Sequence, residues 1–448
     1  MARFALTSER DSYQWGNKSD DEEYGKCKDT AALGFWRHIA TLPCSDVSLV
    51  VQKFGGTSVA DADRIREVAD HVARCCRRGD QVVLVVSAMG KETDELLRLA
   101  NEVSKSQPGR EMDLLITAGE RKASALVAMA LDDAGVPSAS FTGSQAGFET
   151  DSNHRNAKIL AVNPHRVREA IDNGMVPIVA GSQGISPEKD VTFLGRGGSD
   201  TTAVALAHAL EADACELYTD VSGVFTTDPR VVADARKMST ISFDEMLEMT
   251  AVGCPKPVMR SVEVAQRFRV PLHVRSAFTW EPGTWVIEED PTMEQAIVKA
   301  VVPDTSEAKV TVVGVADEPG IAAGMFRSLA DAGVNVDMIV QNVSTEGHTD
   351  ISFTCPREEA DTAASICAAS AQDSEVITDT EIGRISLVGA GMKSNPGVAA
   401  QMFETLAQSD INIEMISTSA IRISCVVRSA DVDNATQLLH DAFDLANA

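Results

Sequence analysis

The chain has 448 residues, 44% of them hydrophobic and 24% charged, and its 66 acidic and 40 basic side chains give a net charge of −26. This length is enough for about three domains with sizeable cores, and the composition excludes a disordered or collagen-like chain. A charge of this sign repels phosphodiester backbones, so we expect no nucleic-acid partner.

The first 46 residues differ from the rest of the chain. They include the polar run SDDEEYGK and show neither helical nor strand periodicity, which predicts a disordered extension, with docking onto the core as the alternative. No apolar run is long enough to cross a membrane and no signal-peptide pattern is present, so we expect a cytoplasmic protein without a membrane partner. The nine cysteines are irregularly spaced and fit neither a disulfide framework nor a zinc site.

From Val47 to about residue 290 the pattern is typical of an α/β domain. Apolar runs predict strands, and amphipathic runs between them predict helices. The predicted strands are residues 48–54, 81–89, 176–181 and 214–220, and the predicted helices are residues 60–78, 201–212 and 243–252. Alternation of this kind favours a mostly parallel central sheet that is covered on both faces.

An internal repeat follows this domain. PGIAAGMFRSLADAGVNVDMI (319–339) recurs as PGVAAQMFETLAQSDINIEMI (396–416), at a constant offset of 77. Each copy predicts a small ferredoxin-like α+β unit, over residues 309–380 and 381–448. The second copy lacks its last strand, and the segment 291–308 is predicted to be a linker plus a strand, QAIVKAVV, that completes it. The first unit would then be inserted in the second.

The segment LVVQKFGGTS (49–58) places a lysine at the end of a strand before two glycines and a helix start. Gly55 and Gly56 let the backbone approach a ligand, helix-initial amides point toward an anion, and Lys53 adds a positive charge. This pattern indicates phosphate binding. An ordinary strand-to-helix turn with a solvent-facing lysine is the alternative.

A second segment, TFLGRGGSDTTAVALAHAL (192–210), repeats this design. Arg196 in the glycine-rich loop suits a bidentate grip on a carboxylate or phosphate, Ser199 is the predicted N-cap, and Asp200 falls in the first turn. A capped helix after a flexible loop is the alternative here.

Two further segments are candidates for ligand contact. YTDVSGVFTTDPR (218–230) follows a strand and suits a loop that lies over a nucleotide. Glu120, in LLITAGERKAS, follows an apolar strand-like run, so we expect it at a strand end, with a helix-surface charge as the alternative. The chain has no GxxxxGK[ST], HRD or DFG motif, which argues against P-loop NTPases and protein kinases.

The segments KFGGTS, VVSAMG, TAGER, GRGGSDTT, YTDVSGVFTTDPR and VPLHVRS, in this order and followed by the two repeats, resemble the aspartate kinases with tandem ACT domains. The likeness is greatest to the actinobacterial branch regulated by lysine and threonine. It implies an amino-acid kinase (carbamate kinase-like) sandwich over residues 47–290 and two ACT domains. The implied activity is ATP-dependent phosphorylation of the β-carboxylate of L-aspartate, the first step toward diaminopimelate, lysine, methionine and threonine.

The resemblance also implies roles for individual residues, with Lys53 and Asp200 as the catalytic pair. Mg²⁺ is expected with the ATP, without a readable protein ligand. The expected ATP-binding residues are Lys53, Phe54, Gly55, Gly56, Gly197, Gly198, Thr219, Asp220, Phe225, Thr226, Thr227, Asp228, Pro229, Arg230 and Lys256. The expected aspartate-binding residues are Ser87, Thr93, Glu120, Arg196 and Ser199. The family places a lysine where this chain has Pro255, so Lys256 is shifted by one position.

For regulation, we expect the turn before each repeat helix and the start of the next strand to become neighbours and to hold an amino acid. The expected effector residues are Asp317, Gly320, Ala322, Asp337, Gln341 and Ser344 of one copy with Asn412, Ile413 and Ser419 of a partner. Lysine and threonine are the expected effectors. The ACT resemblance implies a homo-oligomer that forms through the ACT domains. A shorter isoform that contains only the regulatory part is compatible with this resemblance. A catalytically impaired amino-acid sensor is the alternative function.

Overall fold

The computed structural model describes residues 48–288, 297–342, 347–371 and 374–447. The predicted extension, residues 1–46, lies outside this part of the chain. The described residues belong to one compact unit. None of the described helices is long and apolar enough to span a membrane.

Eight strands form the central sheet, in the spatial order β10-β12-β11-β9-β1-β2-β6-β3. All neighbours are parallel except β11 and β12. The strands are β1 (Leu49–Phe54), β2 (Gln81–Val86), β3 (Ser138–Phe141), β6 (Val176–Ala180), β9 (Ala214–Thr219), β10 (Thr240–Ser242), β11 (Leu272–Ser276) and β12 (Thr284–Ile287). The inner strands are apolar on both faces because both faces are covered.

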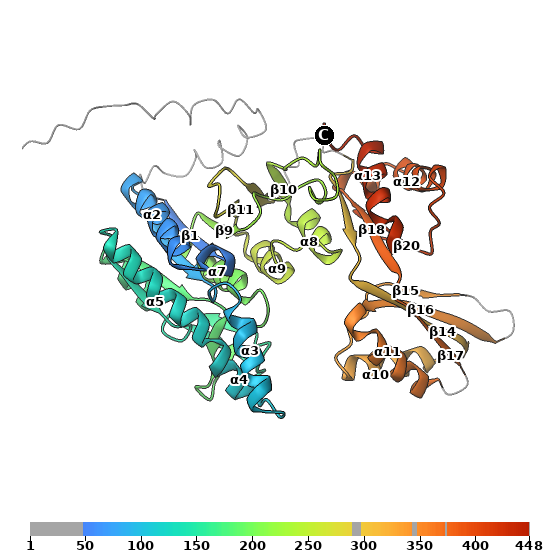
Figure 1. The fold of residues 1–448 in the computed structure, drawn as a ribbon, viewed down its shortest axis with the longest axis horizontal. Coiled ribbons are helices and arrows are strands. Elements are labelled where there is room, and N and C mark those ends of the chain that lie inside the picture. The colour runs from blue at the N-terminus through green and yellow to red at the C-terminus, as the bar shows by residue number, and fades with distance from the viewer. Residues whose placement is uncertain (1–47, 289–296, 343–346, 372–373, 448) are drawn as a thin grey trace, which may run out of the picture. The chain divides into compact units, whose positions relative to one another are not determined.

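Helices cover the two faces of this sheet, as predicted. On one face α2 (Ala62–Arg78) and α5 (Ala118–Asp133) lie side by side (Figure 1) and share a core with β1, β2 and β6. The core on the other face includes buried side chains of α6 (His165–Asp172), α7 (Gly198–Leu210), α8 (Phe243–Ala251) and α9 (Met259–Phe268).

A smaller sheet, absent from the sequence prediction, joins β5 (Ile159–Val162), β4 (Phe148–Thr150), β7 (Gln183–Ile185) and β8 (Val191–Phe193). The helix α4 (Gly109–Ile116) packs on β8, and α3 (Glu92–Val103) packs on α4. The short 3-10 helix η1 (Gly56–Val59) follows β1.

The two repeat copies form two antiparallel sheets with helices, as predicted. The first unit contains β14 (Glu307–Ala316), α10 (Ile321–Asp331), β15 (Ile339–Gln341), β16 (His348–Pro356), η2 (Arg357–Glu359), α11 (Ala360–Ser370) and β17 (Glu375–Asp379). The second contains β18 (Ile382–Val388), η3 (Ala390–Ser394), α12 (Gly397–Gln408), β19 (Met415–Thr418), β20 (Arg422–Arg428), η4 (Ser429–Asp431) and α13 (Val432–Ala442).

The second sheet is completed by β13 (Ala300–Asp304), which pairs antiparallel with β18. The first unit is therefore inserted between β13 and the rest of the second unit, as the sequence predicted. The strand begins at Ala300, later than the predicted residue 295.

Side chains of α8 connect the α/β domain to the second repeat unit. Glu245 is fully buried and accepts hydrogen bonds from Lys299 Nζ (3.0 Å) and the Ala390 amide (3.1 Å). One turn later, Glu248 lies 3.2 Å from the Arg422 guanidinium and accepts a 2.8 Å hydrogen bond from Ser419. These contacts give the repeat unit a direct connection to a helix of the α/β domain.

Candidate active site

A cleft of about 580 Å³ opens at the carboxyl ends of β1, β2, β6 and β9. This is the edge of an open α/β sheet at which ligands bind. The predicted residues in its lining are Lys53, Gly55, Gly56, Ser87, Thr93, Glu120, Arg196, Gly197, Ser199, Asp200, Thr219, Asp220 and Lys256.

At the floor of the cleft, Lys53 and Asp200 form a buried ion pair. Lys53 is on β1 and Asp200 is in the first turn of α7, and their charged groups are 2.5 Å apart. The two side chains are 7% and 4% exposed. The contact lacks hydrogen-bond geometry at the carboxylate oxygen, so it fixes the lysine mainly by charge. A buried ammonium held in this way can receive a phosphate oxygen without first losing bulk water.

Two glycines allow the backbone to close around this floor. A side chain on Gly56 would come within 2.8 Å of the Ala88 carbonyl oxygen. Gly197 has a φ of +75° and directly precedes α7, where a side chain would lie 2.7 Å from Val258. Both positions therefore require glycine, and the adjacent backbone lines the cleft.

The N-cap prediction for Ser199 is wrong, because α7 begins at Gly198 and Gly197 is its N-cap residue. With the left-handed backbone at Gly197, the helix starts two residues earlier than it would after a cap at Ser199. The Ser199 hydroxyl instead lies 2.8 Å from that of Ser182. It is buried at the wall of the cleft.

Glu120 does not lie at a strand end, as predicted, but in the first turn of helix α5. The preceding apolar run is the helix α4 rather than the predicted strand, and its buried Met112 and Ile116 are one helical turn apart. Glu120 is 3% exposed, and burial raises its pKa to about 7. It also lines the cleft, so its carboxylate is available to a positively charged group.

Arg196 and Lys256 bring positive charge to the cleft from two different loops. Arg196 is exposed and follows β8, which leaves its guanidinium accessible to an incoming anion. Lys256 lies before α9, in the segment where the sequence departs from the family pattern, and it still lines the cleft with Lys53.

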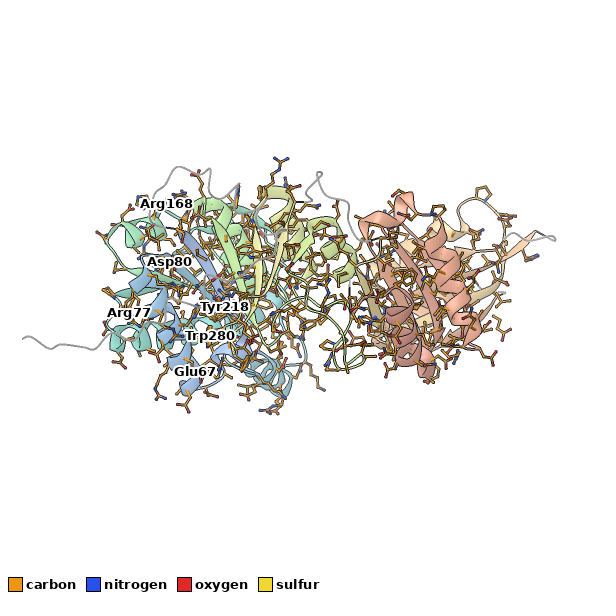
Figure 2. The ribbon with its side chains drawn as sticks, turned by 90° about the horizontal axis from the view of Figure 1, so that it is seen from above. Glu67, Arg77, Asp80, Arg168, Tyr218 and Trp280 are labelled. Carbon is orange, nitrogen blue, oxygen red and sulfur yellow. The ribbon has the colours of Figure 1, made fainter. Side chains whose placement is uncertain are left out.

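Several predicted nucleotide contacts do not line the cleft. Phe54 is fully buried in the core and stacks on Tyr218 with ring centroids 4.7 Å apart. Tyr218 in turn lies beside Trp280 (Figure 2), 5.6 Å between centroids. The other predicted residues outside the lining are Gly198, Phe225, Thr226, Thr227, Asp228, Pro229 and Arg230. Within that loop Thr226 and Thr227 are buried, and Arg230 is paired with Asp228 at 2.6 Å.

The structure adds lining residues that the sequence analysis missed, and they include Thr57, Asp94, Arg155 and Ser182. Ser182 follows β6 at the same sheet edge at which Gly55 follows β1. Lys53 and Thr219 also lie at the carboxyl ends of their strands, so the same reasoning from strand ends could have identified Ser182. Arg155 lies in an irregular loop with a positive φ of 69°, and its position had no comparable signal.

The expected closeness of the two effector segments within one repeat copy is wrong. Ala316 pairs with His348 at one end of β16, whereas the Asp337 amide donates to Thr354 near the other end. These partners are separated by about 20 Å along the strand, at ~3.3 Å per residue. Helix α10 runs between the two segments, so its start and the strand after it lie at opposite ends of the unit.

Asp337 has a structural partner within the chain. Its carboxylate contacts Arg384 of β18, which is 2% exposed and also lies 3.2 Å from Asp304 and 3.0 Å from Glu307. Gly320, Ala322 and Gln341 lie in the first repeat unit and Asn412, Ile413 and Ser419 in the second; Ser344 lies outside the described residues.

Comparison with known proteins supports this geometry. A model of the amino acid kinase family matches residues 48–276, and an ACT-domain model matches residues 310–370 and 385–443. The aspartokinase of Mycolicibacterium smegmatis is 54% identical over 408 residues, and the match covers 89% of this chain and 97% of that protein. The aspartokinase of Corynebacterium glutamicum is 53% identical over 407 residues, with the same two coverages.

Solved structures agree in fold. The aspartate kinase of Synechocystis is 40% identical, with a TM-score of 0.51, and the match covers 89% of this chain and 69% of that one. Aspartokinase III of E. coli, solved in complex with aspartate and ADP, has a TM-score of 0.74 at 24% identity, covering 88% and 99%. The chain therefore belongs to the aspartokinases of the amino acid kinase family, enzymes whose kinase domain is followed by ACT domains.

Proposed function

We propose that this enzyme transfers the γ-phosphoryl group of ATP to the β-carboxylate of L-aspartate and so forms 4-phospho-L-aspartate. A carboxylate oxygen attacks the γ-phosphorus while the bond to the β,γ-bridging oxygen breaks, and ADP leaves. The observation that carries the proposal is that one cleft contains a buried lysine, an accessible arginine and a buried glutamate. These three groups match the phosphoryl group, the α-carboxylate and the α-ammonium of the substrates.

Each of these groups has a separate task in the proposal. Lys53, positioned by Asp200, neutralises charge on the transferred phosphoryl group, because phosphoryl transfer needs positioning and charge stabilisation more than covalent help. Arg196 binds the α-carboxylate in a bidentate manner, and Glu120 binds the α-ammonium. Ser87, Thr93 and Ser199 line the same cleft and complete the proposed aspartate site.

The nucleotide side is proposed to run from the two glycine loops to Thr219, Asp220 and Lys256, which line the same cleft. The loop 225–230 would bound the nucleotide from outside the present lining. Mg²⁺ would accompany the ATP, neutralising charge on its phosphates. Asp220 is an exposed carboxylate at the cleft and thus a suitable oxygen ligand for a cation that keeps several waters and phosphate oxygens.

We further propose that the reaction is the first step toward diaminopimelate, lysine, methionine and threonine, and that lysine and threonine together inhibit it through the repeat units. Because the effector segments of one copy lie at opposite ends of its sheet, the proposed pocket needs residues from a second copy. Two exposed isoleucines support such pairing: Ile339 on the edge strand β15 and its repeat equivalent Ile416 on β19. Edge strands of this kind must be paired or covered.

The direct test is an assay of the purified chain with ATP, Mg²⁺ and L-aspartate, in which hydroxylamine traps the acyl phosphate as a hydroxamate. ADP and hydroxamate should form in equal amounts and only when aspartate is present. Replacing aspartate by glutamate tests the acceptor. A chain that binds lysine or threonine but forms no hydroxamate would be the catalytically impaired sensor instead.

A further inference from the structure

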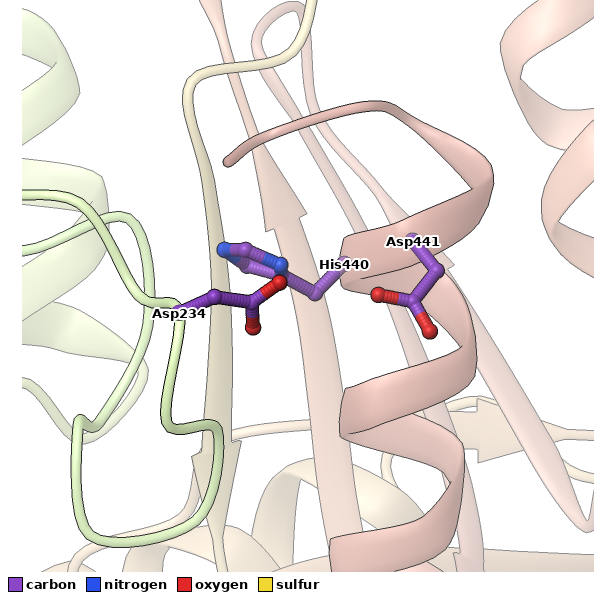
Figure 3. Close-up of side chains that lie close together, drawn as sticks. All are labelled: Asp234, His440 and Asp441. Atoms are coloured by element: carbon purple, nitrogen blue, oxygen red, sulfur yellow. The ribbon is translucent and has the colours of Figure 1, made fainter. Parts of the chain in front are cut away.

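Three ionisable side chains meet where the α/β domain contacts helix α13 (Figure 3). None of the three lines the catalytic cleft. Asp234 comes from the loop between β9 and β10, and His440 and Asp441 come from the last turn of α13. One ligand atom from each side chain lies within 4.8 Å of the others. This cluster has no part in the proposed phosphoryl transfer.

The histidine is buried and only half satisfied. His440 is 0% exposed, and its Nε2 lies 2.9 Å from the Thr226 hydroxyl. Its Nδ1 is buried and has no hydrogen-bond partner. The two carboxylates of the cluster are nearby, but neither of them accepts a hydrogen bond from this nitrogen. An unsatisfied buried nitrogen is costly unless some ligand or ion completes it.

The Thr226 contact is compatible with a metal-binding form of the imidazole. The Thr226 hydroxyl already accepts the Arg236 amide at 2.9 Å and has a second lone pair for a ring N–H. With the proton on Nε2, the Nδ1 lone pair points into a space shared with two carboxylates. Histidine ligands in metal sites use their second nitrogen in the same way.

We propose that Asp234, His440 and Asp441 bind a divalent transition-metal ion of the Zn²⁺ type. One imidazole and two carboxylates suit such an ion better than Mg²⁺ or Ca²⁺, which prefer an all-oxygen set. Both carboxylates are exposed, so water can fill the remaining coordination positions and the ion has an entry path.

The site would join parts of the chain that are distant in sequence. Thr226 and His440 are 214 positions apart. The Thr226 carbonyl oxygen also accepts a hydrogen bond from the amide of Val301 in β13, a strand of the second repeat unit's sheet. The bound ion therefore fixes the loop 225–237 against α13. This proposal stands on the cluster alone and does not depend on the proposed reaction.

The experiment is a calorimetric titration of Zn²⁺ into the full-length, chelator-treated protein in the absence of nucleotide. We expect one ion per chain, together with a rise in melting temperature, because an ion that binds only the folded state stabilises it. Asp234→Asn and Asp441→Asn keep the side-chain shape and should each weaken Zn²⁺ binding by more than ~100-fold, since even outer-shell changes cost about 10–100-fold. Asp433→Asn, an exposed position on the same helix, is the matched control and should leave the affinity unchanged.

Co²⁺ absorption is the second readout, because cysteine ligands would add a sulfur charge-transfer band. The site is supported if the wild-type protein binds Co²⁺ without that band and if His440→Gln no longer binds Co²⁺. If His440→Gln fails to fold, the two exposed asparagine variants decide. Absence of Zn²⁺ binding, equal affinity in the asparagine variants, or a thiolate band would overturn the proposal.

Discussion

The Lys53 ammonium lies 2.5 Å from the Asp200 carboxylate across the junction of β1 and α7, and both side chains are almost fully buried. A cation held there by a single carboxylate is preorganised for an anionic transition state, because little solvent or side-chain movement is needed when charge develops.

Lys53→Ala should therefore reduce kcat by at least ~100-fold, the typical effect of losing one preorganised charge partner. Hydroxamate formation at saturating substrate gives the rate, and circular dichroism checks the fold. Lys105→Ala, at an exposed lysine after α3, is the control and should retain full turnover. Turnover within a few-fold of wild type in Lys53→Ala would remove this lysine from the mechanism.

Glu120 should make both catalysis and stability depend on pH near neutrality. Burial raises its pKa from 4.5 to about 7, so between these values the unfolded chain has released a proton that the folded protein keeps. Stability then falls as the pH rises through this window, by up to about 3 kcal/mol. An ammonium group binds the ionised form, so kcat/KM for aspartate should rise with pH until about 7.

Glu120→Gln separates these effects because it cannot ionise. Its melting temperature relative to wild type should increase from mildly acidic to neutral pH, and its kcat/KM should be low and lack the rising limb. A wild-type pH profile that is flat across neutrality, or a limb that persists in Glu120→Gln, would contradict the assignment.

Arg384→Ala should strongly destabilise the repeat units. It would leave the carboxylates of Asp304, Glu307 and Asp337 without the buried cation that they share, and breaking a buried pair costs about 3–5 kcal/mol. Arg428→Ala is the comparison, because that arginine bonds Asp379 and Glu414 but its side chain is 43% exposed. Thermal unfolding should show a large loss for Arg384→Ala and only a small one for Arg428→Ala; equal losses would refute the difference in burial as the cause.

Glu248→Gln should weaken feedback inhibition while leaving the basal rate near normal. Glu248 contacts Arg422 and Ser419 of the second repeat unit and lies outside the catalytic cleft. The measurement is the inhibition by lysine plus threonine at fixed aspartate. Glu263→Gln, at an exposed glutamate of the neighbouring helix α9, is the control and should be inhibited by lysine plus threonine as strongly as the wild type. Unchanged inhibition in Glu248→Gln would mean that the signal takes another route.

The predictions from sequence succeeded where local pattern and global fold agree. Three features are encoded in short runs of residues: the strand that ends at Phe54, directly after Lys53, the glycines at 55–56, and the repeat at 319–339 and 396–416. The sequence also predicted that a strand before the first repeat completes the sheet of the second one, because the second copy is one strand short.

The failures have physical causes. The apolar run before Glu120 is short enough to fit either a strand or a helix, and only burial at helical spacing distinguishes them. Ser199 looked like a cap because the left-handed backbone of Gly197 cannot be read from sequence. The group formed by Asp234, His440 and Asp441 could not be predicted, since tertiary packing alone brings these residues together.

The pairing of β13 with β18 sets where a separate regulatory polypeptide could begin. A fragment that starts after Asp304 would keep both repeats in sequence and yet expose the edge of β18, whose seven residues are all buried in the complete chain. Such a fragment should aggregate through that edge, whereas one that starts upstream of Ala300 carries its own protecting strand. During synthesis, β13 must likewise remain unpaired until the whole inserted unit has been made, so the sheet that connects the repeat units to the kinase domain is the last to close.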